Sequence, residues 1–138
     1  MSAITAQEIE ILSTKANAAK GTAYCPYSKF RVGAAILTQS GEYFTGANVE
    51  NASYPVGTCA ERVAFGTAVV AGHRKFKAVA VATDIIPPAS PCGMCRQFMS
   101  EFTTPLVPVY MYDKDMNCTV LTMGELLPNS FGPEDFEH

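Results

Sequence analysis

The sequence has 138 residues, of which 48% are hydrophobic and 17% charged, with a formal net charge of −3. This length fits one domain with a sizeable core, so we expect residues 1–138 to form a single domain. The acidic balance indicates no nucleic-acid partner, and no apolar run approaches the roughly 20 residues that span a membrane.

The N-terminal part of the chain predicts one helix and then a β-hairpin. Thr5 and Glu8 have the spacing of a capping box, and apolar residues at helical spacing predict a helix over residues 5–20. Gly21 is expected to end this helix. The remaining elements are a turn-prone segment at 24–28 and two antiparallel strands at 30–37 and 42–49, joined by a turn at 38–41.

The rest of the chain alternates between helices and strands. A loop at residues 50–57 leads into a helix that we expect Gly57 or Thr58 to cap and Gly72 to end. Mostly β-branched and small apolar residues predict a strand at 76–83 that is buried on both faces. The remaining predictions are a helix from 91 or 92 to about 102 with Pro91 in its first position, and strands at 106–112 and 118–122.

These elements predict an α/β fold of three layers, α/β/α. Two successive strand–helix–strand units imply at least one parallel, right-handed crossover, and the flanking hairpins add antiparallel strands. We therefore expect a five-stranded mixed sheet with helices on both faces. The second and third helices should begin at the carboxyl ends of strands, where open α/β sheets bind ligands.

Three of the five cysteines lie in two short clusters, Cys59 in one and Cys92 and Cys95 in the other. The N-terminal segment does not resemble a signal peptide, so we expect a soluble intracellular protein of the cytoplasm. In such a reducing compartment, cysteines grouped in this way are metal ligands more often than disulfide partners. Cys92 and Cys95 are three residues apart, which places both sulfur atoms on one face of a helical first turn. Helix N-termini also favour thiolates over thiols.

Three ligands with a nearby glutamate indicate a catalytic zinc site. Structural zinc has four protein ligands, whereas catalytic zinc has three and leaves the fourth position to water or substrate. Zinc nucleobase deaminases have three cysteines, or a histidine and two cysteines, and a glutamate two residues after the first ligand. Cys59 and Glu61 have this spacing. Residues two apart do not share a helix face, so Glu61 can lie beside the metal without binding it.

Two other classes of protein fit parts of the pattern. Cys92 and Cys95 could form a thiol–disulfide redox motif, although that reading leaves Cys59 and Glu61 without a function. The zinc could instead be structural, in a non-enzymatic module. Its fourth ligand would then be one of three residues that we otherwise interpret as two unligated thiols and a surface histidine: Cys25, Cys118 and His73.

Five segments together resemble the small, homotetrameric cytidine deaminases whose zinc ligands are all cysteines. The resemblance extends from about Tyr24 to Asp135. The segments are Tyr24-Cys25-Pro26-Tyr27-Ser28-Lys29-Phe30, Asn48-Val49-Glu50-Asn51-Ala52, Thr58-Cys59-Ala60-Glu61-Arg62, Pro91-Cys92-Gly93-Met94-Cys95-Arg96-Gln97 and Leu126-Leu127-Pro128-Asn129-Ser130-Phe131-Gly132-Pro133.

The resemblance implies a reaction and a cofactor. Cytidine and 2′-deoxycytidine would be hydrolysed to the uridines and ammonia, with one zinc ion per chain held by Cys59, Cys92 and Cys95. Glu61 would transfer protons between water, N3 of the pyrimidine and the leaving amine. Arg62 would donate hydrogen bonds to the cysteine sulfur atoms and offset their negative charge.

The resemblance also implies substrate contacts and a homotetramer with shared active sites. Asn48 and Glu50 would bind the ribose hydroxyls. Phe30 and Val32 would lie against the base, and Phe131 of a neighbouring subunit would stack near the pyrimidine. Ala60, and Tyr54 of a neighbouring subunit, are the remaining substrate-binding residues that the resemblance implies. Within the same chemistry, a modified cytosine nucleoside or the cytosines of a polynucleotide are alternative substrates, although the acidic balance makes the polynucleotide less favourable.

Overall fold

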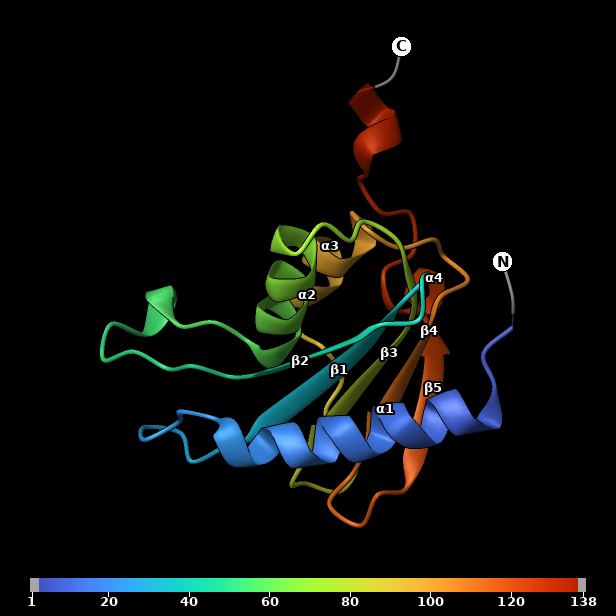
Figure 1. Ribbon diagram of the computed structural model, residues 1–138. Coiled ribbons are helices and arrows are strands. Elements are labelled where there is room, and N and C mark those ends of the chain that lie inside the picture. Colours follow the sequence, from blue (N-terminus) through green and yellow to red (C-terminus); the bar gives the residue numbers. More distant parts are fainter. Residues whose placement is uncertain (1–2, 137–138) are drawn as a thin grey trace.

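A mixed five-stranded sheet forms the centre of the protein in the computed structural model, which describes residues 3–136 (Figure 1). The strands are β1 (Val32–Thr38), β2 (Tyr43–Ala47), β3 (Phe76–Thr83), β4 (Pro108–Tyr112) and β5 (Cys118–Thr122). They are arranged in the order β2-β1-β3-β4-β5, and only β3 and β4 pair in parallel. The prediction of a five-stranded mixed sheet is therefore confirmed.

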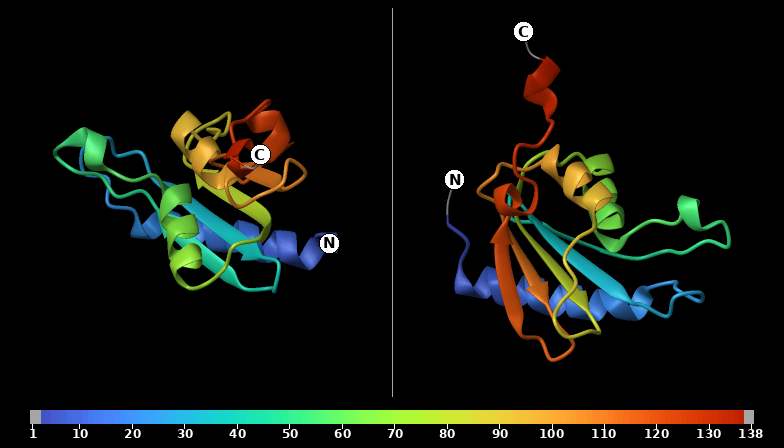
Figure 2. Two further views of the ribbon diagram at one scale, coloured as in Figure 1. Left: turned by 90° about the horizontal axis from the view of Figure 1, so that it is seen from above. Right: turned by 180° about the vertical axis from the view of Figure 1, so that it is seen from behind.

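Helices cover both faces of the sheet, as predicted (Figures 1 and 2). Helix α1 (Ala6–Ala19) crosses one face, and α2 (Ala60–Val70) and α3 (Gly93–Ser100) lie on the other. The short helix α4 (Met123–Leu126) follows β5, and single 3₁₀ turns lie at Lys20–Thr22, Tyr54–Val56 and Pro133–Phe136. The protein has the three-layer α/β/α architecture.

Alternating side chains of the strands divide the core into two halves. On β1, Ala34 and Ile36 pack towards α2, whereas Ala35 and Leu37 pack towards α1. All eight residues of β3 are buried, which confirms that this strand is covered on both faces. Gly46 of β2 allows a close approach of the backbone of α2, because a Cβ atom there would lie 2.5 Å from the nitrogen of Ala64.

Several predicted ends of elements are corrected by the structure. Cys59, not Gly57 or Thr58, is the N-cap of α2, and Cys92 is the N-cap of α3, so Pro91 precedes that helix. The capping box of α1 is confirmed, but the chain continues through a 3₁₀ turn past Gly21. Helix α4 was missed although its own capping box is visible in the sequence.

The first strand of the hairpin, β1, starts later than predicted because the side chain of Asn48 forms hydrogen bonds with the backbone of Phe30 and Val32. The amide of Asn48 accepts a hydrogen bond from the nitrogen of Val32 at 2.9 Å and donates one to the carbonyl oxygen of Phe30 at 2.7 Å. Regular pairing of β1 therefore begins at Val32 rather than at residue 30.

Strand direction brings the starts of α2 and α3 together. Both β2 and β3 are antiparallel to β1, so they run in the same direction and end at the same edge of the sheet. The chain passes from the end of β2 to α2 and from the end of β3 to α3. The two helices that carry the cysteine clusters thus begin near one edge, as the topology predicts for a ligand site.

We expect replacement of Asp84 by asparagine to lower the free energy of unfolding by about 2 kcal/mol, as it breaks a partly buried ion pair. Asp84 accepts hydrogen bonds from Lys20 at 2.8 Å and from Arg31 at 2.9 Å, and the side chain of Lys20 is only 7% exposed. The change should be smaller than for a fully buried pair, because the side chain of Asp84 is 36% exposed. Urea denaturation of the variant measures it.

The pH dependence of the same variant provides a second test. Arg31 first and then Lys20 hold the pKa of Asp84 below its ordinary value. A depressed carboxyl pKa stabilises the fold above the pKa of the unfolded chain, about 4, and this contribution disappears as the pH falls. As the pH is lowered to below about 4, the free energy of unfolding should therefore fall less in the variant than in the wild type. Asp115→Asn, on the exposed turn before β5, is the control, and equal stabilities of wild type and D84N would contradict the assignment.

Candidate active site

The three predicted metal ligands meet in one group. The sulfur atoms of Cys59, Cys92 and Cys95 all lie within 4.8 Å of one another, and those of Cys59 and Cys92 are 3.9 Å apart. Cys59 and Cys92 are N-caps, and neither side chain is used to cap its helix. Both sulfur atoms are thus free to bind a metal at the positive ends of two helices.

No fourth ligand completes this group among the residues that the structure describes. Cys25 and Cys118 are free thiols outside the group, and the ring of His73 is paired with Glu42. This arrangement does not support a structural zinc site with four protein ligands. Three sulfur donors with one remaining position fit a catalytic zinc ion.

The short distances between the sulfur atoms affect the pKa values of the thiols. The neighbouring thiol of Cys95 and then the guanidinium of Arg62 lower the pKa of Cys59 to about 5. The neighbouring thiol of Cys59 and burial raise the pKa of Cys95. Cys59 is therefore the thiolate of the pair, and a thiolate is the form of cysteine that binds a metal ion.

Arg62 lies against the sulfur of Cys59, one turn along α2 from its N-cap. Its Nη2 atom donates a hydrogen bond to that sulfur at 3.4 Å, and this contact raises the pKa of the guanidinium. The Nε atom of Arg62 is buried and has no hydrogen-bond partner among residues 3–136. The charged guanidinium of Arg62 is therefore held within the site rather than in solvent.

Glu61 is buried beside the thiols and is 4% exposed. Burial, with a smaller contribution from the charge of Cys59, raises the pKa of its carboxyl to about 7. Glu61 also raises the pKa of Cys95, so the three groups share one electrostatic environment. A carboxyl with such a pKa can hold or release a proton at neutral pH.

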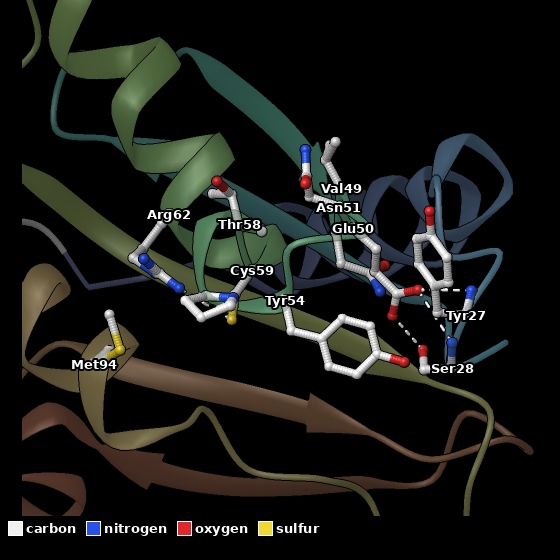
Figure 3. Close-up of a pocket in the computed structure, with 13 residues that line it drawn as sticks. Tyr27, Ser28, Val49, Glu50, Asn51, Tyr54, Thr58, Cys59, Arg62 and Met94 are labelled. Carbon is white, nitrogen blue, oxygen red and sulfur yellow. Dashed lines mark hydrogen bonds between the residues drawn. The ribbon is translucent and has the colours of Figure 1, made fainter.

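A cavity of about 470 Å³ opens beside Cys59 (Figure 3). Its volume is typical of sites for small molecules, which measure about 300–1,000 Å³. Residues 48–51, 54–55 and 57–59 line it, and Tyr27 and Ser28 lie beside Glu50. Of the predicted site residues, five line this cavity: Asn48, Glu50, Tyr54, Cys59 and Arg62.

Other predicted substrate contacts lie outside this cavity. Ala60 is fully buried in the core, and Phe30 and Val32 are partly buried next to the amide of Asn48. Phe131 is 59% exposed, and its carbonyl oxygen accepts a hydrogen bond from Gln97 of α3 at 2.9 Å. The substrate contacts of these residues stay predictions.

Tyr27, Ser28 and Met94 also line the cavity, although they were not predicted as site residues. Tyr27 packs on Tyr54 with ring centroids 5.8 Å apart. Ser28 belongs to a segment that carries the family resemblance, but no partner for its hydroxyl was predicted. Met94 is exposed between Cys92 and Cys95, and its side chain reaches the cavity (Figure 3).

The site consists of three thiols and a buried glutamate at the starts of two helices of a three-layer α/β/α fold. This combination defines the zinc-dependent deaminases of nucleobases and nucleosides. Residues 6–111 match the family described as cytidine and deoxycytidylate deaminase zinc-binding region. The chain belongs to this family, and zinc is its cofactor.

Individual relatives agree with the family match. The chain is 44% identical to a cytidine deaminase from Sporosarcina psychrophila over 131 residues, which cover 95% of this chain and 96% of the relative. The crystal structure of cytidine deaminase from Burkholderia pseudomallei superposes with a TM-score of 0.86 and 43% identity, over 93% of this chain and 100% of that one. For cytidine deaminase from Mycobacterium tuberculosis the TM-score is 0.77 at 33% identity, over 91% and 98%.

None of the helices within residues 3–136 combines the length and apolar character of a membrane span.

Proposed function

We propose that this chain hydrolyses cytidine and 2′-deoxycytidine to uridine and 2′-deoxyuridine, with release of ammonia. The observation that carries the proposal is the group of three sulfur atoms within 4.8 Å, with the buried carboxyl of Glu61 beside it. The identity of 44% to a cytidine deaminase over almost the whole chain supports the choice of substrate.

Zinc supplies the activated water of this reaction. A bound zinc ion lowers the pKa of water in contact with it from 15.7 towards about 7, so that hydroxide is present at neutral pH. Cys59, Cys92 and Cys95 would hold the ion. Because two of these thiols cap helices, the partial positive charges of the helix N-termini reduce the excess negative charge of three thiolates.

Glu61 moves the protons. It takes a proton from water, delivers it to N3 of the pyrimidine as C4 is attacked, and then passes a proton to the departing amine. The pKa of about 7 supports this role, since the carboxyl can be ionised before the reaction and protonated during it. Burial of Glu61 also keeps bulk water from exchanging the transferred proton.

Asn48 and Glu50 bind the sugar in this proposal, and Phe30 and Val32 face the base. The amide of Asn48 already holds the backbone of Phe30 and Val32, so one side chain links the sugar contact to the base contact. Glu50 and Cys59 line the same cavity, which supports a substrate that contacts the carboxylate of Glu50 and lies beside a proposed metal ligand.

We further propose a cytoplasmic homotetramer in which Tyr54 and Phe131 complete the sites of neighbouring subunits. Tyr54 is 73% exposed and Phe131 59% exposed, although aromatic side chains are usually covered. Light scattering of the purified protein tests the assembly. A monomer with full activity would contradict the shared sites.

Arg62→Gln should weaken zinc affinity or activity by about 10- to 100-fold, the usual effect of removing a group that supports a metal ligand. The guanidinium donates to Cys59 and supplies a positive charge next to three thiolates. Competition with a chromogenic chelator measures the affinity. Arg74→Gln, which removes an exposed arginine at the other end of α2, is the control, and unchanged affinity and rate in R62Q would remove the assignment.

The function is tested by following the absorbance change as purified protein converts cytidine to uridine. Turnover should disappear with a chelator and return with zinc. Absence of turnover in protein that holds one zinc per chain would favour a structural module. Absence of zinc would favour the redox alternative, and reaction of only a modified nucleoside or of a polynucleotide would change the substrate.

A further inference from the structure

The carboxylate of Glu50 is held by the loop at residues 24–30 (Figure 3). Its Oε1 atom accepts hydrogen bonds from the backbone nitrogens of Tyr27 and Ser28, each at 3.1 Å. Its Oε2 atom accepts a hydrogen bond from the hydroxyl of Ser28. These bonds, with that of the hydroxyl first among them, lower the pKa of Glu50 and keep it ionised.

The hydroxyl of Ser28 connects two predicted substrate contacts. A serine hydroxyl has one proton to donate, and an ionised carboxylate can only accept, so the proton of Ser28 goes to Glu50. The oxygen of the same hydroxyl accepts a hydrogen bond from the backbone nitrogen of Phe30 at 3.0 Å. Loss of this hydroxyl therefore releases Glu50, whereas the backbone of Phe30 is still held by the amide of Asn48.

The loop that presents Ser28 is itself fixed in place. Lys29 has a φ of 60°, a conformation that is unfavourable for residues other than glycine and persists only where neighbouring contacts hold it. Its nitrogen donates to the carbonyl oxygen of Cys25 at 3.0 Å. At the start of the loop, Tyr24 pairs with residues 48 and 50 through two backbone hydrogen bonds of 2.9 and 2.8 Å.

We propose that Ser28 is a positioning residue that sets the orientation of the Glu50 carboxylate towards the sugar of the nucleoside. This inference rests on the proposed function. Ser28 and Glu50 line the same cavity, and an ionised carboxylate has about four acceptor positions, of which the loop uses three. One position remains for a sugar hydroxyl, and the hydroxyl of Ser28 fixes which way it points.

The experiment compares Ser28→Ala with the wild type on two substrates, cytidine and 2′,3′-dideoxycytidine. With cytidine, kcat/KM should fall about tenfold and mainly through KM, because a hydrogen bond to a charged group is worth at least this factor. With dideoxycytidine the variant should lose less than about twofold, since the 2′- and 3′-hydroxyls that Glu50 would bind are both absent. The second substrate separates positioning of Glu50 from a general disturbance of the loop.

Two further variants complete the test. Ser28→Thr keeps the hydroxyl and should retain the kcat/KM of the wild type with cytidine. Ser53→Ala, in the neighbouring loop, removes a hydroxyl that has no hydrogen bond to the described part of the chain, and it should leave both substrates unaffected. Zinc content and thermal denaturation of each variant show that its fold is retained.

Three results would overturn the inference: an equal loss with both nucleosides, an unchanged kcat/KM in S28A, or a threonine variant as impaired as the alanine variant. The first would assign Ser28 to the base contact or to the loop. Turnover by the wild type, measured beforehand, separates these outcomes from failure of the proposed function. A wild type that deaminates neither nucleoside would overturn both proposals.

Discussion

Glu61→Gln should lower kcat by a factor of roughly 100 to 10,000, the range that general acid–base catalysis contributes. The amide of glutamine can neither take a proton from water nor deliver one to the pyrimidine. It is nevertheless close to isosteric with the carboxyl, and it carries no charge to bury. Because burial already raises the pKa of Glu61 to about 7, a neutral group at this position should be tolerated by the fold.

Zinc content decides how the loss of turnover is interpreted. E61Q should retain one zinc per chain, because the proposed ligands are the three sulfur atoms and not the carboxylate. Steady-state kinetics and metal analysis of the same preparation measure both quantities. Glu10→Gln on the exposed face of α1 is the control for an equal change of charge. Turnover within about twofold of the wild type would contradict a role in proton transfer.

The metal centre could be predicted because its geometry is local. Cys92 and Cys95 share a helical turn, and Cys59 and Glu61 lie at the first turn of another helix, so spacing alone placed each pair. Strand order then brought the two helix starts to one edge of the sheet. Sequence periodicity was sufficient for the sheet, since the fully buried β3 and the cross-strand hairpin have clear patterns.

The network around the sugar site could not be predicted, because it depends on contacts between distant residues. The Asn48 amide was expected to bind substrate, and in the structure it also holds the backbone of Phe30 and Val32. The partners of Glu50 come from residues more than 20 positions earlier in the chain. Helix ends were misplaced for a different reason: cysteine is an uncommon N-cap, so Thr58 and Pro91 were favoured by propensity.

Gly46→Ala should have a large effect on stability, although the residue lies outside the metal centre. A Cβ atom at this position would lie 2.5 Å from the nitrogen of Ala64 and 2.6 Å from the carbonyl oxygen of Ala60. Both are backbone atoms of α2, so no side-chain rotation can relieve the contact. We expect the free energy of unfolding to fall by about 3 kcal/mol, the upper part of the usual range for overpacking.

The methyl group added in G46A should also disturb the metal site. Helix α2 carries Cys59 as its N-cap and Glu61 in its first turn, so a shift of the helix away from β2 moves a ligand and the proposed proton carrier together. Zinc affinity, measured by chelator competition, should therefore fall along with stability, which is measured by urea denaturation at a fixed excess of zinc. The fixed excess is required because bound metal itself stabilises the folded state.

Gly66→Ala supplies the matched control on the same helix. A Cβ atom at Gly66 has no neighbour within 4 Å, and alanine is favoured over glycine in a helix interior by about 0.5–1 kcal/mol, so this variant should be slightly stabilised. The two substitutions are chemically identical and differ only in what the added methyl group meets. If G46A and G66A had the same stability and zinc affinity, close packing of α2 on β2 would not be what holds Cys59 and Glu61 in position.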